Sequence, residues 1–336
     1  QGYSSAASDV YKRQALFLSS LFLNSCKNDG LTNITVAEVT HSLFYAPQYI
    51  AINKGYFKDE GLNVNVITTP GADKTMAALL SKEAQIGLMG PEATVYVYNG
   101  GEKNYAVNFA QLTQKDGSFL LGREKIDNFT YDMLKGKTLI GGRKGGMPEM
   151  TLEYVLKNQG LTVTRNGEDL NADVNIRTDV NFDVMAGVFT AGQSDYVTLF
   201  EPSASQVERN GIGHIVASIG ESSGVVPYTC YSSLKDYLSD NSETINKFTR
   251  AIKKGLEFVY SASMDELVEA LSPSFVSSDN EEITRVMTNY LNIQAWPTSL
   301  ELKEENYNRL IEIVTMAGEL DKPAPFEKIV NNTFSK

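Results

Sequence analysis

Residues 38–62 read EVTHSLFYAPQYIAINKGYFKDEGL, a pattern that predicts a strand, a turn, a helix and the approach to a second strand. The β-branched run Thr35–Thr40 indicates the first strand, and Leu62–Thr68 alternates apolar and polar residues like the second. Between them, large apolar residues recur at steps of three and four, which suits a helix packed on a sheet. Pro47 fits the first turn of that helix, where its missing N–H costs nothing. The result is a βαβ unit, and open α/β sheets bind ligands at the carboxyl ends of their strands.

The composition is that of a globular protein large enough for two domains. Of 336 residues, 42% are hydrophobic and 21% are charged, which is ordinary for a folded chain. A formal net charge of −11 argues against nucleic-acid binding, because no basic stripe is present to neutralise phosphates. The only cysteines, Cys26 and Cys230, lack the spacing of metal ligands, so we expect neither a metal nor a cofactor.

The first 26 residues have the pattern of a secretion signal. A Lys-Arg pair precedes the apolar run 15–23, which is too short to span a bilayer but suits the central region of a signal peptide. Leu23-Asn-Ser-Cys26 then resembles a bacterial lipobox, so we expect Cys26 to become the lipidated amino terminus, with an ordinary cleaved signal as the alternative. Residues 1–14 resemble adapter-derived read-through and are left out of the fold prediction, and residues 27–32 are expected to be a polar tether.

A longer resemblance begins within the same βαβ unit. The run APQYIAINKGYFKDEGLNV at residues 46–64 resembles the opening of the periplasmic-type solute-binding proteins of the thiamine-pyrimidine, sulfonate and nitrate group. Three later motifs continue the resemblance: AQIGLMGPEA at 84–93, KGKTLIGGRKGG at 135–146 and the Glu201-Pro202 pair. Since it extends over nearly the whole chain after residue 32, the sequence is identified as a member of this group.

The resemblance implies an α/β fold of the two-lobed, type II periplasmic-binding-protein kind. Two mixed sheets flanked by helices would enclose a ligand cleft at a two-strand hinge, and such a hinge permits closure around a ligand. We expect residues 33–119 and 229–336 to form lobe 1 and residues 120–228 to form lobe 2. The implied partners are the permease and ATPase subunits of an ATP-binding-cassette (ABC) importer. The protein would be a monomer, anchored by lipid to the outer face of the bacterial cell membrane.

The candidate ligand-binding residues lie where strands meet the expected cleft. They are Ser42, Phe44 and Tyr45 after the first strand, Gly90 and Glu92 after the third, Gln111 in the fourth, Gly145, Gly146 and Met147 in a glycine-rich turn, Glu201 and Tyr228. A glycine-rich turn before a helix exposes N–H groups to an anion, but no nucleotide-loop motif follows it. Glu92 could equally stabilise the amino end of its helix, and Glu201 could do the same before Pro202.

The aromatic and acidic candidates favour a flat, amine-bearing ring, so the expected ligand is a thiamine-precursor pyrimidine. An aliphatic sulfonate such as taurine, or nitrate, is the alternative, because helix amino ends can hold an oxyanion unaided. A sensory or adhesive surface lipoprotein that serves no permease is a third reading.

The resemblance also offers an enzyme as an alternative function. A fungal pyrimidine synthase shares the implied fold, uses its own histidine as a donor and carries pyridoxal phosphate on a lysine. Those positions fall in GLMGPEA and are occupied here by Met89 and Ala93. Without the lysine no Schiff base can form, so we expect a binding protein and not an enzyme.

Overall fold

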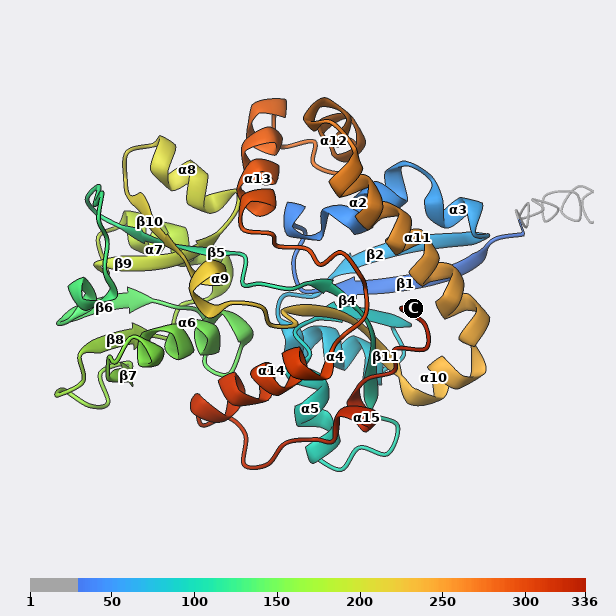
Figure 1. Cartoon of the computed structure of the whole chain (residues 1–336), viewed down its shortest axis with the longest axis horizontal. Coiled ribbons are helices and arrows are strands. Elements are labelled where there is room, and N and C mark those ends of the chain that lie inside the picture. The colour runs from blue at the N-terminus through green and yellow to red at the C-terminus, as the bar shows by residue number, and fades with distance from the viewer. Residues whose placement is uncertain (1–29) are drawn as a thin grey trace, which may run out of the picture.

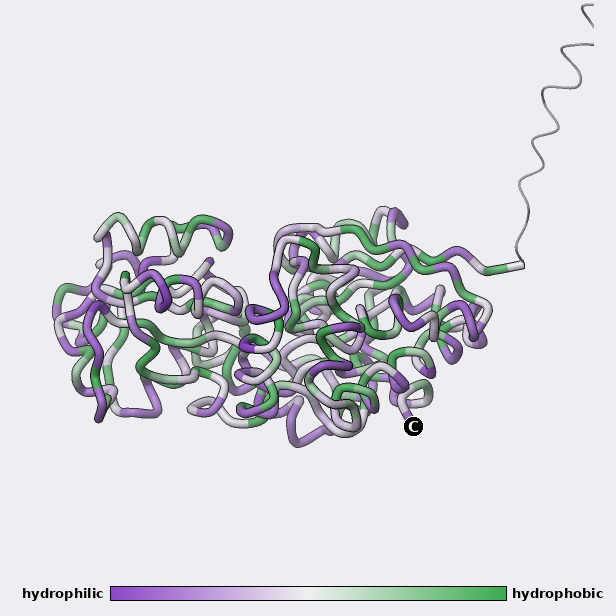
Figure 2. Tube along the Cα trace, turned by 90° about the horizontal axis from the view of Figure 1, so that it is seen from above, coloured by the Kyte–Doolittle hydropathy of each residue, from purple (hydrophilic) through white to green (hydrophobic). Residues whose placement is uncertain are grey.

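The computed structural model describes residues 30–336, which form two α/β lobes (Figure 1). The apolar run 15–23 and the lipobox cysteine Cys26 lie outside the described residues. Figure 2, which views the molecule from above, shows the lobes as two masses joined at the middle. No helix in the described part of the chain is both long and apolar enough to span a lipid bilayer.

The sheet of lobe 1 has five strands in the order β2-β1-β3-β11-β4. Their bounds are β1 (Thr32–Glu38), β2 (Leu62–Thr68), β3 (Ile86–Met89), β4 (Ala106–Thr113) and β11 (Thr229–Leu234). The strands β1, β2 and β3 run parallel, whereas β11 is antiparallel to both β3 and β4. The sheet is therefore mixed, and its late strand β11 comes from the chain after its return from lobe 2.

The predicted βαβ unit is present, but its helix is divided into three. The pieces are the 3₁₀ turn η1 (Leu43–Tyr45), α2 (Ala46–Asn53) and α3 (Tyr56–Asp59). Pro47 lies in the first turn of α2, as predicted. The division between α2 and α3 falls at Gly55, whose φ of 76° lies in the left-handed region that glycine adopts without strain.

Further helices cover the lobe 1 sheet. They are α4 (Ala72–Leu80), α5 (Glu92–Asn99), α10 (Lys235–Asp240), α11 (Ser242–Ser261), α12 (Met264–Leu271), α13 (Asn280–Asn292), α14 (Glu304–Met316) and α15 (Phe326–Ile329). The predicted apolar stripe of α11 is confirmed, because Ile245, Phe248, Ile252, Leu256 and Val259 are all buried. The stripe faces α2, and at Gly255 the two helices approach so closely that a Cβ would lie 2.1 Å from the carbonyl oxygen of Pro47.

The sheet of lobe 2 has six strands in the order β10-β5-β9-β6-β8-β7. They are β5 (Ser118–Gly122), β6 (Lys137–Ile140), β7 (Val163–Arg165), β8 (Val174–Arg177), β9 (Tyr196–Phe200) and β10 (His214–Ser218). Its helical segments are η2 (Tyr131–Leu134), α6 (Met147–Asn158), η3 (Phe182–Val184), α7 (Met185–Thr190), α8 (Ser203–Arg209) and α9 (Ile219–Ser223). Strand β5 is antiparallel to its neighbours and the β7-β8-β6-β9 part is parallel, so this sheet is also mixed.

The chain crosses between the lobes twice, and the two crossings are bonded to each other. The N–H of Val226 donates to the carbonyl of Gln114 at 2.9 Å, and the N–H of Tyr228 donates to that of Thr113 at 3.1 Å. Two mixed sheets flanked by helices and joined at a paired crossing confirm the predicted fold class. The junction brings side chains from both lobes together.

Candidate ligand-binding site between the lobes

An aromatic cluster occupies the junction between the lobes. Its members come from η1, the end of β9, the return crossing and α13: Phe44, Tyr45, Phe200, Tyr228 and Tyr290. The ring of Phe44 lies at the centre, with its centroid 5.0 to 5.9 Å from those of the other four. All except Phe200, which is partly buried, are buried.

Local contacts hold Phe44 in this position. The Ser42 hydroxyl accepts a hydrogen bond from the N–H of Phe44 at 3.1 Å and so caps η1. The indole N–H of Trp296 donates to the carbonyl of Phe44 at 2.9 Å. Gly117 lies against the ring, since a Cβ there would be 2.7 Å from Phe44 and 3.0 Å from Phe200. A side chain at this glycine would therefore displace the aromatic cluster.

Glu92 is a buried acid at the start of α5, at the same junction. Burial raises the pKa of its carboxyl to about 8, although its own backbone N–H and that of Met147 face it and oppose the rise. One of its oxygens, Oε2, has no hydrogen-bond partner among the described residues. A carboxyl with this pKa is mostly protonated at neutral pH, so it can both donate and accept a hydrogen bond.

Asp116 is a second buried acid, located in the first crossing. Burial raises its pKa to about 7, while its hydrogen bond with Ser118 and the nearby Tyr228 hydroxyl oppose the rise. Its Oδ1 accepts from the N–H of Ser118 at 2.7 Å. The sequence analysis missed Asp116, because Lys-Asp-Gly after a strand has the composition of an exposed turn. Its position directly after a buried strand and within a crossing was the signal that could have identified it.

The two acids act on one aromatic side chain, Tyr228, and Glu92 also acts on Tyr45. Burial raises the pKa of the Tyr228 hydroxyl well above its usual value, and the charges of Asp116 and Glu92 add to that rise. Burial, together with the charges of Glu38 and Glu92, does the same for Tyr45. The acids therefore lie close to the aromatic cluster at the junction of the lobes.

The predicted glycine-rich turn reaches this site from lobe 2. The backbone N–H of Met147, the first residue of α6, faces the Glu92 carboxyl and lowers its pKa, and the hydroxyl of Tyr96 lies 3.4 Å from the carbonyl of Gly145. Gly90 leaves the space that the carboxyl needs, because a Cβ there would lie 2.0 Å from Glu92 Oε2. Gly90 and Glu92 thus meet the turn Gly145-Gly146-Met147.

Glu201 is buried beside the site with both oxygens already bonded. It accepts from the N–H and the hydroxyl of Ser205, at 3.0 and 2.7 Å, and from the side-chain amide of Asn289 at 2.5 Å. These contacts cap the start of α8 and join it to α13. Its carboxylate therefore has a structural role that needs no ligand. The sequence analysis gave this role, at the start of a helix, as the alternative to ligand binding.

Gln111 lies apart from the acids. It lines a separate cavity of about 340 Å³ at the hinge, together with Gln114, Val225 and residues of the segment 297–306. Its side-chain amide donates to the carbonyl of Thr113 at 3.3 Å. Because this cavity shares no lining residue with the aromatic cluster, we expect Gln111 to act on the hinge more than on a ligand.

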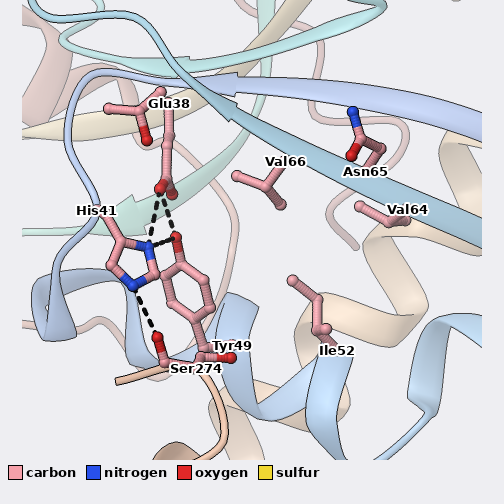
Figure 3. Close-up of a pocket in the computed structure, with 9 residues that line it drawn as sticks. Glu38, His41, Tyr49, Ile52, Val64, Asn65, Val66 and Ser274 are labelled. Carbon is pink, nitrogen blue, oxygen red and sulfur yellow. Dashed lines mark hydrogen bonds and ion pairs between the residues drawn. The ribbon is translucent and has the colours of Figure 1, made fainter. Parts of the chain in front are cut away.

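A third polar feature, shown in Figure 3, lies between β2 and α2 in lobe 1. It is a pocket of about 280 Å³ with the buried Glu38 beside Tyr49 and His41. The Tyr49 hydroxyl donates to Glu38, and the His41 ring contacts the Tyr49 hydroxyl at 2.7 Å and the Ser274 carbonyl at 2.8 Å. The interaction with Glu38 raises the pKa of His41. His41 thus ties the end of β1 to the loop between α12 and α13.

No group of three or more His, Cys, Asp or Glu side chains within residues 30–336 could hold a metal ion.

Paired crossings, two lobes and a polar, aromatic site at their junction define the class as a two-lobed periplasmic-binding-protein fold. The chain belongs to the NMT1/THI5-like family, whose model matches residues 44–263.

Three known proteins illustrate this relationship. The chain is 43% identical over 315 residues to the "Putative binding protein YtlA" of Bacillus subtilis (strain 168), covering 94% of this chain and 92% of that protein. It is 25% identical over 240 residues to the 4-amino-5-hydroxymethyl-2-methylpyrimidine phosphate synthase of Aspergillus parasiticus, covering 67% of each. The alkanesulfonate-binding protein SsuA from Xanthomonas axonopodis pv. citri has the same fold, with a TM-score of 0.67, 15% identity and coverage of 89% and 98%.

Proposed function

We propose that this protein is the extracytoplasmic solute-binding component of an ABC importer and captures a thiamine-precursor pyrimidine between its lobes. One observation carries the proposal: two buried acids, Glu92 and Asp116, share a site with a cluster of aromatic rings. The glycine-rich turn that ends in Met147 reaches Glu92 from lobe 2. The protein would capture and release its ligand without catalysing a reaction.

The ligand class follows from hydrogen-bonding capacity and shape. An aminopyrimidine presents a ring nitrogen that accepts and an amino group that donates on one edge. A neutral carboxyl such as that of Glu92 offers the matching donor and acceptor. The flat ring suits a site walled by Phe44 and Tyr228, since aromatic rings associate through faces and edges. The name of the Aspergillus relative contains such an aminopyrimidine, which supports the same class here.

Binding is favoured over synthesis by the residues near Glu92. Met89 is buried in β3 and Ala93 lies in the first turn of α5, so neither position offers the amine or the imidazole that the synthase chemistry needs. The YtlA relative is named as a binding protein. We also propose a lipid anchor at Cys26, a permease and an ATPase as partners, and a monomeric state.

An oxyanion ligand is the second candidate. The N–H groups at the start of α6 approach the site, helix amino ends bind anions, and a protonated Glu92 could donate to an oxygen. The SsuA neighbour is named as an alkanesulfonate-binding protein. A sulfonate or nitrate would bind to the turn Gly145-Gly146-Met147, and the aromatic cluster would contribute less to its binding.

A thermal-shift titration of the purified protein separates these ligands, because a ligand that binds the folded state raises the midpoint of unfolding. We expect a saturable rise with 4-amino-5-hydroxymethyl-2-methylpyrimidine and its formylamino counterpart. The rise should be lost in Glu92→Gln and retained in Glu83→Gln, a control at an exposed acid. A rise with taurine, longer alkanesulfonates or nitrate alone would contradict the pyrimidine proposal, and so would no rise with any of these compounds.

A further inference from the structure

Arg165, the last residue of β7 in lobe 2, bonds to three carboxylates through different nitrogens. Its Nε lies 2.9 Å from Oε1 of Glu149 and its Nη2 lies 2.7 Å from Oε2 of Glu153, both on α6. Its Nη1 lies 2.9 Å from Oε1 of Glu319, which follows α14. We call Glu149, Glu153, Arg165 and Glu319 the clasp. A planar guanidinium holds such partners in fixed geometry, which a lysine cannot do.

The clasp fixes the carboxyl end of α14 to lobe 2. Arg165 Nη2 also donates to the carbonyl of Ala317 at 2.7 Å. Lys157 of α6 donates to the carbonyl of Met316 at 2.8 Å and forms an ion pair with Glu153 at 2.5 Å. The carbonyl groups that end a helix carry partial negative charge, so two cations at this end stabilise it.

The same helix is also attached to lobe 1. Helix α14 packs against α5 as well as α6, and Figure 1 shows it at the lower middle of the molecule, between these two helices. After Glu319 the chain continues to α15, which packs on β4. The carboxyl end of α14 therefore forms a third link between the lobes, beside the two crossings of the hinge.

The clasp leads from α14 to the glycine-rich turn of the site. Glu149, which is not exposed at all, accepts from the N–H of Gly145 at 3.3 Å through its second oxygen. Two residues later the backbone N–H of Met147 faces the Glu92 carboxyl and lowers its pKa. Contacts thus lead from Glu319 to the turn beside the acid that we propose to bind the ligand.

The charges of this region are balanced by partners on both sides of the junction. Three acids of the clasp face Arg165, Lys157 and Lys144, whose Nζ lies 3.7 Å from Glu319. Burial raises the pKa of Glu149 to about 7, and the charge of Arg165 opposes this rise. Removing one partner from a buried ionic group leaves an uncompensated charge, which is strongly unfavourable. Separation of α14 from lobe 2 would leave charged groups of the clasp without their partners.

We propose that Arg165 is a positioning residue that couples closure of the two lobes to the placement of the Gly145-Gly146-Met147 turn, through its bonds to Glu319 and Glu149. It touches no ligand. The inference goes beyond the identity of the ligand and concerns the ligand-free protein as well. On this proposal, opening of the lobes moves α14 with lobe 1 and breaks the bond between Arg165 and Glu319, so the clasp favours the closed form before any ligand is present.

The test measures lobe closure and turn exchange in the ligand-free protein. Glu319→Gln keeps the size of the side chain and removes its charge, and Arg165→Lys keeps the charge and removes the fork geometry. In both we expect a larger radius of gyration by small-angle X-ray scattering. Backbone amides of residues 145–147 should exchange with solvent about tenfold faster, which corresponds to about 1.4 kcal/mol of lost protection.

Asp179→Asn is the matched control, because Asp179 forms an exposed ion pair with Arg177 within lobe 2. It should change neither quantity. Far-ultraviolet circular dichroism identifies any variant that fails to fold. Glu319→Gln is the milder of the two substitutions, because Glu319 lies at the edge of the clasp. A folded Glu319→Gln protein with unaltered radius of gyration and unaltered exchange at residues 145–147 would overturn the proposal. Because no ligand is used, this outcome is independent of whether the pyrimidine binds.

Discussion

The Glu92 carboxyl in lobe 1 faces the backbone N–H of Met147 in lobe 2, so the amino end of α5 meets the amino end of α6. Each helix end contributes partial positive charge, yet burial keeps the pKa of Glu92 at about 8. The acid is therefore held mostly protonated at the place where the lobes touch.

This protonation predicts that the protein loses stability as pH rises. The folded-state pKa of Glu92, about 8, is above the ordinary value of 4.5, so the folded state retains a proton that the unfolded state releases. The contribution is complete below about pH 4.5 and is lost as pH rises to about 8, with a slope of up to about 1.4 kcal/mol per pH unit. Urea unfolding at pH 5, 6, 7 and 8 measures it.

Glu92→Gln should flatten this pH dependence without abolishing it, because Asp116, with a pKa of about 7 against an ordinary 3.8, contributes with the same sign. Glu83→Gln, at an exposed acid, should leave the slope unchanged. A free energy of unfolding that rose steadily from pH 5 to 8 would show that these acids are not protonated in the folded state.

Phe44→Leu should weaken ligand binding by about tenfold or more while the protein stays folded. The leucine keeps an apolar side chain but removes ring contacts with Tyr45, Phe200, Tyr228 and Tyr290, and such contacts contribute about 0.5–1.5 kcal/mol each. Calorimetric titration with the hydroxymethyl aminopyrimidine checks the affinity. Phe258→Leu on α11 serves as the control. Equal affinity in wild type and Phe44→Leu would mean that the aromatic cluster does not form the binding surface.

Gly255→Ala should destabilise the protein by about 1–3 kcal/mol, because an added Cβ would overlap the carbonyl of Pro47 and push α11 away from α2. Gly187→Ala on α7 is the control, since a Cβ there meets nothing within 4 Å. Alanine has the higher helix propensity, so this control should be neutral or slightly stabilising. Thermal unfolding distinguishes the two, and similar midpoints for both variants would contradict the close packing of α2 on α11.

Glu38→Gln should lower the pKa of His41 toward its ordinary value, because the interaction with Glu38 is what raises it. The raised folded-state pKa means that the contribution of His41 to stability is present below about pH 6.5 and declines at higher pH. Proton NMR follows the ring signals in both proteins, and the sequence has only one other histidine, His214. An unchanged His41 titration in the variant would contradict the arrangement in Figure 3.

Local patterns predicted the elements that depend on local spacing. The strands on either side of η1 and α2, Pro47 in the first helical turn and the buried stripe of α11 all follow from periods of two and 3.6 residues. The division of the first helix at Gly55 was not predicted as such, although the glycine itself marks the position. The three-residue strand β7 was missed, because three residues are too few to show a period.

The contacts that build the site and the clasp join residues far apart in the chain. Arg165 and Glu319 are separated by 154 positions, and Glu92 meets Met147 only because the hinge brings two lobes together. No local pattern carries that information. Asp116 was missed for the same reason, since its burial is caused by packing of both lobes around the crossing.

Fluorescence of the single tryptophan tests ligand capture between the lobes most directly. Trp296 is buried, and its indole N–H donates to the carbonyl of Phe44 at the centre of the aromatic cluster. Titration with 4-amino-5-hydroxymethyl-2-methylpyrimidine should give a saturable change in its emission that is lost in Glu92→Gln. A saturable change with alkanesulfonates only, or the same response in wild type and Glu92→Gln, would contradict a pyrimidine held by the buried acids.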